Sequence, residues 1–259
     1  MTVMQKLSTN PRDQFSRIAA FVYGVVCYAI FFLTILYTCG FVGNILVPRS
    51  IDSAPLLPLG HALLIDASLI MLFAVQHSVM ARDAFKQWWT KFIPPVVERS
   101  TYVLFSSLCL IALFYFWQPL GGTIWAVTNT TMVVILYTLF GAGWLIVLGS
   151  TFLINHFDLF GLRQVWFYLR GQDYEPVKFA TPMIYKIVRH PLYVGFLLAL
   201  WATPVMTTTH FVFALLLTGY ILIGIQFEEN DLVNEFGKSY LEYRRQVPML
   251  IPFTQQQKD

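Results

Sequence analysis

Long runs of apolar residues with almost no charges dominate the first 154 residues of this chain. The first run extends from Phe15 to Gly43 and carries no charge after Arg17. Three more follow, at Leu59–Met80, Arg99–Trp117 and Trp125–Ile154. Because a helix of about 20 apolar residues spans the hydrocarbon core of a bilayer, each run predicts a transmembrane helix.

Two further apolar segments lie in the C-terminal part, at Leu192–Met206 and Phe211–Phe227. Only the polar run Thr207–His210 separates them, which predicts a tight hairpin. The first segment is short for a full crossing, so it either spans the bilayer steeply or dips into it. The chain is therefore predicted to be all-α, a polytopic transmembrane helical bundle of five or six membrane segments.

The composition agrees with a single membrane domain. Hydrophobic residues make up 57% of the 259 residues and charged residues 12%, about half of the ~25% that soluble domains carry. We expect transmembrane helices in 1–154, a cytosolic connection in 155–191, and a hairpin and tail in 192–259. The net charge is only +3 and the three cysteines lie in apolar runs. We therefore expect no nucleic-acid partner, no metal and no obligate protein partner.

Lysine and arginine predict the orientation. All of the 17 except Arg49 lie in the N-terminal tail, the connection after Met80, the stretch 155–191 or the C-terminal tail. Positive residues favour the cytosolic side of a membrane protein. We therefore expect an integral protein of the bacterial inner membrane with both termini and its active site in the cytosol. This orientation needs an even number of crossings, so with five segments one would be re-entrant.

The first group of candidate site residues is Arg189-His190-Pro191. Proline suits the first turn of a helix, so Arg189 and His190 are placed at a helix entrance. Free N–H groups and a partial positive charge at that entrance favour an anion. The alternative is a basic anchor at the membrane interface. Gly195, on the first turn, would allow a close approach to the helix.

The second group, Glu228 and Glu229, ends the last apolar segment. A helix C-terminus prefers cations, so this placement is locally unfavourable, and such departures often mark a site. The alternative is a helix that emerges into water with solvated acids. A tight hairpin would bring these acids to face Arg189 and His190. Basic and acidic walls together suit a zwitterionic ligand with an amine or a sulfonium.

The third group is Tyr240 and Tyr243, which lie three residues apart and therefore on one helical face. Their rings could enclose an adenine or pack over the hairpin. The alternative is an amphipathic helix on the membrane surface.

These groups resemble the isoprenylcysteine carboxyl methyltransferase-like superfamily of membrane methyltransferases. The shared pattern is Arg-His-Pro-x-Tyr-x-Gly, then Glu-Glu-x-x-Leu, then Phe-Gly-x-x-Tyr-x-x-Tyr and a final Val-Pro, in this order across 185–253. The resemblance implies S-adenosylmethionine bound between the hairpin and the tail. It places the following residues at or near that cofactor: Arg189, His190, Tyr193, Gly195, Glu228, Glu229, Tyr240, Tyr243 and Arg244.

The N-terminal half is similar to a narrower family, the bacterial methanethiol S-methyltransferases. The similarity is carried by Gln76–Arg82, Pro94–Tyr102 and Asn155–Gln164. It implies methylation of methanethiol, a small volatile thiol, to dimethyl sulfide with release of S-adenosylhomocysteine. The alternatives are carboxyl methylation of a prenylcysteine, amine methylation of a phospholipid and, more distantly, a non-catalytic membrane protein.

Two histidines are candidates for the base that such a reaction needs. The thiolate is the nucleophile, and histidine is suited to accept its proton near neutral pH. His77 lies at the cytosolic end of the second predicted helix, and His156 follows the fourth. Asp158 is near enough in sequence to orient His156. The alternative for each histidine is a structural role.

Overall fold

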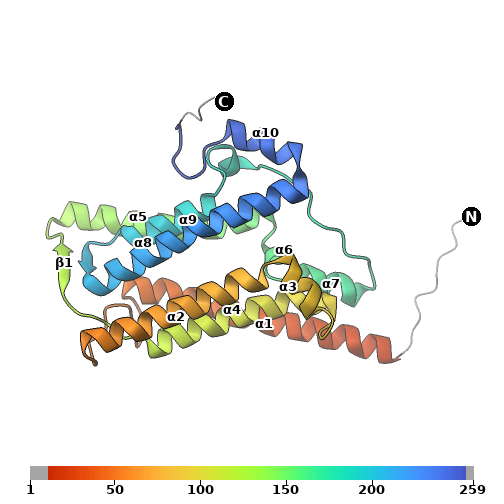
Figure 1. The fold of residues 1–259 in the computed structure, drawn as a ribbon, viewed down its shortest axis with the longest axis horizontal. Helices are drawn as coiled ribbons and strands as arrows, with labels where there is room; N and C mark the ends of the chain where they lie inside the picture. The colour runs from red at the N-terminus through yellow and green to blue at the C-terminus, as the bar shows by residue number, and fades with distance from the viewer. Residues whose placement is uncertain (1–10, 255–259) are drawn as a thin grey trace, which may run out of the picture.

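The computed structural model describes residues 11–254, and helices make up most of them (Figure 1). The long helices are α1 (Pro11–Gly43), α2 (Leu59–Met80), α4 (Pro95–Phe116), α5 (Thr130–Ile154) and α9 (Thr208–Phe236). The shorter ones are α3 (Asp83–Trp89), α6 (His156–Leu159), α7 (Leu162–Arg170), α8 (Pro191–Trp201), α10 (Lys238–Gln246) and the 3-10 turn η1 (Met183–Lys186). Two short strands, β1 (Thr123–Ala126) and β2 (Val205–Thr207), complete the fold.

Five helices, α1, α2, α4, α5 and α9, are long and apolar enough to cross a membrane. The predicted all-α polytopic bundle is therefore confirmed. The sixth predicted segment forms α8, which has only 11 residues. At about 1.5 Å per residue α8 is about 16 Å long, roughly half the thickness of a hydrocarbon core.

The connection between α8 and α9 lies at residues 202–207, earlier in the chain than the predicted Thr207–His210. Residues 205–207 form β2, which pairs antiparallel with β1, and α9 begins directly at Thr208. The Thr207 side chain caps α9 by accepting a hydrogen bond from the His210 amide at 3.0 Å. Pairing with β1 supplies hydrogen-bond partners for the backbone of this extended segment, as non-helical backbone in an apolar environment requires.

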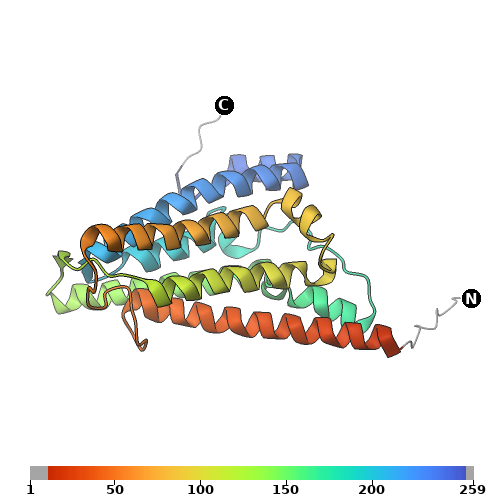
Figure 2. The ribbon, with the colours of Figure 1, turned by 60° about the horizontal axis from the view of Figure 1, so that its bottom comes forward.

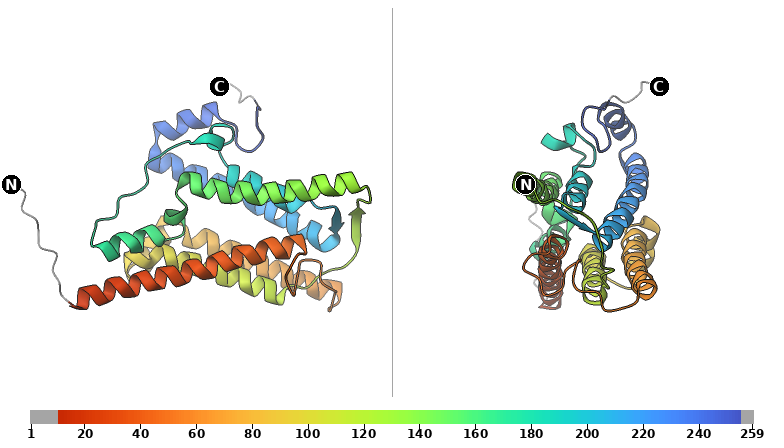
Figure 3. Two further views of the ribbon diagram at one scale, coloured as in Figure 1. Left: turned by 180° about the vertical axis from the view of Figure 1, so that it is seen from behind. Right: turned by 90° about the vertical axis from the view of Figure 1, so that its left-hand side faces the viewer.

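The helices form two layers of three (Figure 3). One layer holds α1, α4 and α2, with α7 packed on α1, and the other holds α5, α8 and α9. Inside the second layer, Gly143 of α5 lies against Gly195 of α8. A methyl group on Gly195 would lie 2.6 Å from the carbonyl oxygen of Gly143. Two glycines therefore let these two backbones approach each other closely.

The two ends of the bundle differ. We call the end with β1 and β2 the ribbon end, and the opposite end, with α3, α7 and α10, the tail end (Figures 1 and 2). Arg49, the exception among the basic residues, is at the ribbon end. Its guanidinium donates to the carbonyl oxygens of Tyr115 at 2.6 Å and Trp117 at 3.3 Å, where a helix C-terminus favours a cation. The basic residues within 1–10 and 255–259, which were predicted to lie in the cytosol, are outside the described residues.

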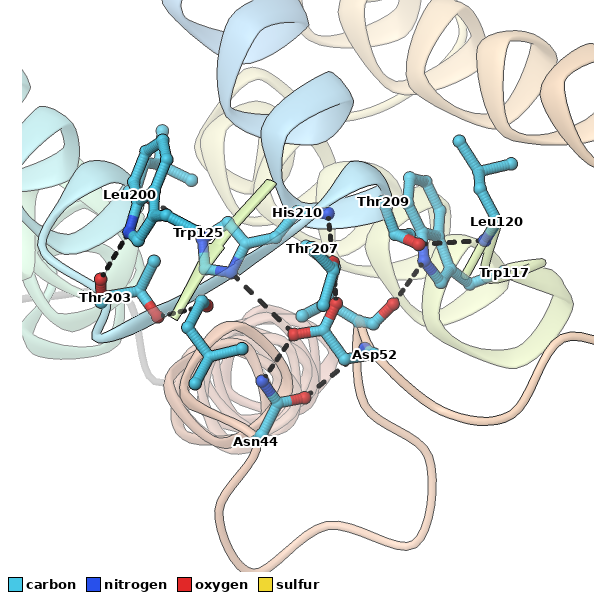
Figure 4. A network of polar contacts seen from close by, with 12 residues as sticks. Asn44, Asp52, Trp117, Leu120, Trp125, Leu200, Thr203, Thr207, Thr209 and His210 are labelled. Atoms are coloured by element: carbon cyan, nitrogen blue, oxygen red, sulfur yellow. Dashed lines mark hydrogen bonds and ion pairs between the residues drawn. The ribbon is translucent and has the colours of Figure 1, made fainter. Parts of the chain in front are cut away.

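A polar network holds the ribbon end together (Figure 4). The Asp52 carboxylate accepts hydrogen bonds from the Thr207 hydroxyl and, at 2.7 Å, from the Asn44 side chain. Thr209 accepts the amide hydrogen of Leu120 at 2.8 Å. These bonds join the loop after α1 to the start of α9, which fixes one end of the helix that carries Glu228 and Glu229 at the other.

Candidate functional site

A buried ion pair joins the start of α8 to the tail end of α9. Two guanidinium nitrogens of Arg189 lie 2.8 and 2.7 Å from one carboxylate oxygen of Glu229. His190 Nε2 lies 3.0 Å from the same oxygen. The three side chains are 9% exposed or less. The short connection between α8 and α9 thus brings the two groups together, as the sequence predicted.

The C-terminal tail closes over this ion pair. The Arg189 guanidinium also donates to the carbonyl oxygens of Arg244 at 3.0 Å and Val247 at 2.6 Å. The backbone amides of Arg189 and His190 donate to Pro248 and Met249. One arginine therefore satisfies acceptors on the tail as well as the carboxylate on α9, so it fixes all three segments together.

The tyrosines of α10 pack beneath the same tail. Tyr243 donates a hydrogen bond to the carbonyl oxygen of Tyr185 at 2.6 Å, and burial raises the pKa of Tyr243 to about 12. Tyr240 is 1% exposed, and burial, reinforced by the nearby Glu229 carboxylate, raises its pKa. Both phenols are therefore neutral near pH 7. The ring of Phe179, from the connection before η1, contacts both rings.

Two buried polar atoms at this site lack a hydrogen bond within residues 11–254. One is the hydroxyl oxygen of Tyr240 and the other is Oε2 of Glu228. The Glu228 atom lies 3.7 Å from His190 Nδ1, too far for a hydrogen bond. Because unsatisfied buried polar groups are costly, these two atoms are where a polar ligand would gain most.

The remaining predicted cofactor residues have different surroundings. The Tyr193 ring lies 5.6 Å from the ring of His190, and Arg244 Nη1 lies 3.8 Å from Glu229. Both border the ion pair. Gly195 instead faces Gly143, and its close approach serves the packing of α8 on α5.

His77 lies on α2 in a polar and aromatic setting. The Tyr102 hydroxyl is 3.0 Å from each of its ring nitrogens, and the Ser106 hydroxyl is 3.2 Å from Nδ1. The ring of Phe73 stacks on the imidazole at 5.2 Å. His77 nevertheless keeps accessible surface, as a side chain that meets a substrate must.

His156 is more enclosed. Its Nε2 lies 2.7 Å from the Tyr28 hydroxyl and its Nδ1 lies 2.8 Å from the Thr151 hydroxyl. The ring of Phe152 stacks on it at 4.2 Å, and the residue is 5% exposed. Burial lowers the pKa of His156, so the ring is neutral near pH 7 with both nitrogens already engaged.

Asp158 does not orient His156, and that prediction is wrong. Its carboxylate pairs with Arg163 at 3.2 Å and accepts a hydrogen bond from the Tyr174 hydroxyl at 2.8 Å. The reason is local: residues two apart on one helical turn point in different directions. Asp158 therefore anchors the connection that follows α7.

The sequence analysis missed several hydroxyl groups, some beside His77 and some beside Glu228. Tyr193 interacts electrostatically with Glu228, Tyr220 and Tyr102, and the Tyr220 hydroxyl lies 3.2 Å from that of Ser78. Tyr193 and Tyr220 keep accessible surface although α4, α8 and α9 converge on them. The sequence feature that could have indicated these groups is tyrosine and serine at inward-facing positions of apolar helices. From the sequence alone, such tyrosines cannot be distinguished from tyrosines at the membrane interface.

Comparison with known proteins gives a consistent result. The phospholipid methyltransferase family matches residues 136–239. A methanethiol S-methyltransferase of Crocosphaera subtropica is 56% identical over 96% of this chain and 98% of its own length. A second one from Bradyrhizobium diazoefficiens is 53% identical over 92% of each chain. One from Mycobacterium tuberculosis is 48% identical over 92% of this chain and 97% of its own. No solved structure matches.

Proposed function

This chain belongs to the methanethiol S-methyltransferase family, and from that membership we propose that it transfers a methyl group from S-adenosylmethionine to methanethiol. The products are dimethyl sulfide and S-adenosylhomocysteine. The proposal rests on the identity that the chain shares with relatives of that name over nearly their whole length. Membership in a family of enzymes also sets aside the alternative of a non-catalytic membrane protein.

The polar atoms at the tail end support S-adenosylmethionine as the methyl donor. This molecule is an amino-acid zwitterion joined to an adenosine, so it offers both donors and acceptors. The Glu228 carboxylate oxygen and the Tyr240 hydroxyl, which lack hydrogen bonds within the described residues, suit such a ligand. When bound, S-adenosylmethionine supplies an electrophilic methyl group on a sulfonium sulfur.

The residues that would hold the donor divide into two roles. Arg189 and Glu229 already satisfy each other, so we propose that they fix the walls of the pocket and the tail above it. The side chains that would contact the ligand are His190, Tyr193, Glu228, Tyr240, Tyr243 and Arg244. Gly195 would act through the packing of α8.

We propose that His77 takes the proton of the thiol. The neutral imidazole accepts the S–H proton and leaves a thiolate, the stronger nucleophile. The Tyr102 and Ser106 hydroxyls that contact the His77 ring and the accessible surface of His77 support this assignment. His156 is the second candidate, although its ring nitrogens are engaged by Tyr28 and Thr151.

The distribution of basic residues supports a location for the site. We propose that the protein lies in the bacterial inner membrane with its tail end and both termini in the cytosol, where positive residues are favoured. The donor is a charged molecule made in the cytosol, so a cytosolic opening would give it direct access. A small apolar thiol could reach the site from either water or lipid.

An assay of the purified protein in detergent tests the proposed reaction. We expect dimethyl sulfide in the headspace, measured by gas chromatography, when both S-adenosylmethionine and methanethiol are present. Omitting either substrate abolishes the signal. A protein that binds the donor yet forms no dimethyl sulfide would contradict the proposal.

The name of the matching family, phospholipid methyltransferase, favours a second candidate function, methylation of a lipid amine. Methylation of a prenylcysteine carboxyl group, the other alternative acceptor, is assayed in the same experiment. We expect methanethiol to be methylated in preference to phosphatidylethanolamine and a prenylcysteine under matched conditions. Faster labelling of either larger acceptor would reassign the substrate and keep the donor site.

A further inference from the structure

Each methyl transfer to a thiol releases one proton, and that proton has to leave the buried site. The thiol S–H bond breaks and its proton goes to His77. The sulfur electron pair forms the new S–C bond, and the old C–S bond breaks with its pair on the sulfonium sulfur, which becomes neutral. His77 must then lose the proton before the next turnover.

A cavity of about 580 Å³ lies at the tail end of the bundle, and Glu98 and Arg99 of α4 stand in its wall. The residues of its wall come from α3, α4, α6, α7 and the connection that follows α7. The polar side chains in its wall include Lys86, Glu98, Arg99, Asp158, Gln164 and Tyr174. Neither Glu98 nor Arg99 has a role in the donor site described above, although Arg99 donates a hydrogen bond to the Leu159 carbonyl at 2.7 Å.

Tyr102 contacts His77 and lies one helical turn from Glu98, a residue of the cavity wall. Its hydroxyl is 3.0 Å from both ring nitrogens of His77, and the Arg99 guanidinium lies 5.0 Å from its ring centroid. Glu98 precedes Tyr102 by four residues on α4 and therefore lies on the same face, one turn away. Helical side chains lean toward the N-terminus, so Tyr102 leans over the turn that carries Glu98.

We propose that Tyr102 passes the proton from His77 to Glu98, from which it enters solvent in the cavity. The hydroxyl oxygen accepts the His77 proton while the hydroxyl proton moves on toward the carboxylate, so Tyr102 ends each cycle unchanged. This assignment rests on the proposed thiol methylation. It makes Tyr102 and Glu98 relay residues, which act after the base rather than on the substrate.

The charged and titratable groups around the relay come from several elements. The Tyr102 hydroxyl interacts with Glu98 and Arg99 of α4, with Arg82 after α2 and with Tyr220 of α9. Glu98 interacts in turn with Arg99 and with Lys86 of α3. Glu98 lies one turn from Tyr102 on α4 and also stands in the cavity wall, so a proton that reaches its carboxylate can pass to solvent there.

Substitution of each relay residue tests the proposal. Tyr102→Phe keeps the ring and removes the hydroxyl, and Glu98→Gln keeps the shape and removes the charge. We expect each to lower the maximal rate of dimethyl sulfide formation by about tenfold or more, with unchanged affinity for S-adenosylmethionine. Added imidazole buffer, which can carry protons, should restore much of the rate. Matched controls are Tyr115→Phe on the exposed side of α4 and Glu175→Gln in the exposed connection.

A second readout needs no donor. In cofactor-free protein labelled with ¹⁵N-histidine, nuclear magnetic resonance follows proton exchange at His77, identified by its loss in His77→Gln. We expect slower exchange in Tyr102→Phe and Glu98→Gln than in the controls. Wild-type rates and exchange in both variants would overturn the relay, as would a slower reaction that buffer does not restore. Absence of dimethyl sulfide from the wild type would overturn the proposed function alone, because the exchange measurement still tests the relay.

Discussion

At the scale of single residues, the Arg189–Glu229 pair determines the form of the site. Removing two charges from water is expensive, and their attraction compensates only when further hydrogen bonds complete the geometry. Here His190 and two tail carbonyls supply those bonds. The pair is therefore a structural centre whose loss should disturb α8, α9 and the tail together.

Replacing Glu229 by Ala should leave the Arg189 guanidinium buried without its partner. We expect a loss of about 3–5 kcal/mol in the free energy of unfolding, measured by denaturation in detergent. The control is Asp231→Asn, which removes an ion pair with Arg82 whose Asp231 side chain is 55% exposed. Exposed pairs contribute about 1 kcal/mol or less, so equal losses in the two variants would contradict this account of the buried pair.

The lowered pKa of His156 predicts a dependence of stability on pH. Burial disfavours the charged ring, so the unfolded chain binds this proton more readily than the folded protein. The free energy of unfolding should therefore fall as the pH drops through the ordinary histidine range, about 6.5. His156→Gln should flatten this part of the profile of melting temperature against pH. The exposed His61→Gln is the control, and an identical profile in His156→Gln would exclude this contribution.

At the scale of elements, the close contact between α5 and α8 depends on two glycines, because no side chain separates the two backbones there. A methyl group on Gly143 would lie 2.7 Å from the carbonyl oxygen of Gly195 and 2.8 Å from the Ala199 amide. Both of these neighbours are backbone atoms, which cannot move aside as the end of a flexible side chain can. The start of α8, with His190 at its N-cap and Tyr193 in its first turn, is therefore positioned by a helix that contributes no predicted site residue.

Gly143→Ala should force α5 and α8 apart. We expect a cost of about 1–3 kcal/mol and weaker donor binding, because the start of α8 would move. Gly149→Ala, on the same helix, meets no atom within 4 Å and should be neutral or slightly stabilising. Thermal unfolding of the two variants decides the matter, and equal stability would show that the contact has room to relax.

The sequence predicted the long helices well and the α8–α9 connection poorly. Apolar runs define α1, α2, α4, α5 and α9 because a membrane imposes their length. The connection was predicted as a simple turn at Thr207–His210, whereas it contains β2 and pairs with β1. Strands of three or four residues leave almost no periodic signal, and this pairing joins segments about eighty residues apart in the chain.

At the scale of the whole molecule, the arrangement of the helices in two layers decides which of the predicted site residues lie together. The residues of α8, α9 and α10 that we propose to bind the donor were predictable as neighbours, because short connections join these helices. The position of His77 relative to Glu228 was not predictable, because it depends on how α2 and α4 face α8 and α9. The orientation of Asp158 was predicted wrongly because nearness in sequence does not fix where a side chain points.

An even number of membrane passages predicts that the two termini are on the same side of the membrane. With α8 and its extended continuation counted as one passage, both termini lie on the same side. Reporter fusions at the two termini should give cytosolic signals, and a fusion in the loop at Gly121–Gly122 should give a periplasmic one. Opposite locations for the two termini would contradict the passage formed by α8 and β2.

The central claim is that the tail end binds the methyl donor through Glu228 Oε2 and the Tyr240 hydroxyl, which lack hydrogen bonds within residues 11–254. Titration calorimetry of S-adenosylmethionine with wild type and Glu228→Gln tests it most directly, with Glu175→Gln as the control. Loss of a hydrogen bond to a charged group is worth about 1.5–3 kcal/mol, so we predict that Glu228→Gln binds the donor at least about tenfold more weakly. Wild-type affinity in Glu228→Gln would contradict the account and place the donor elsewhere in the molecule.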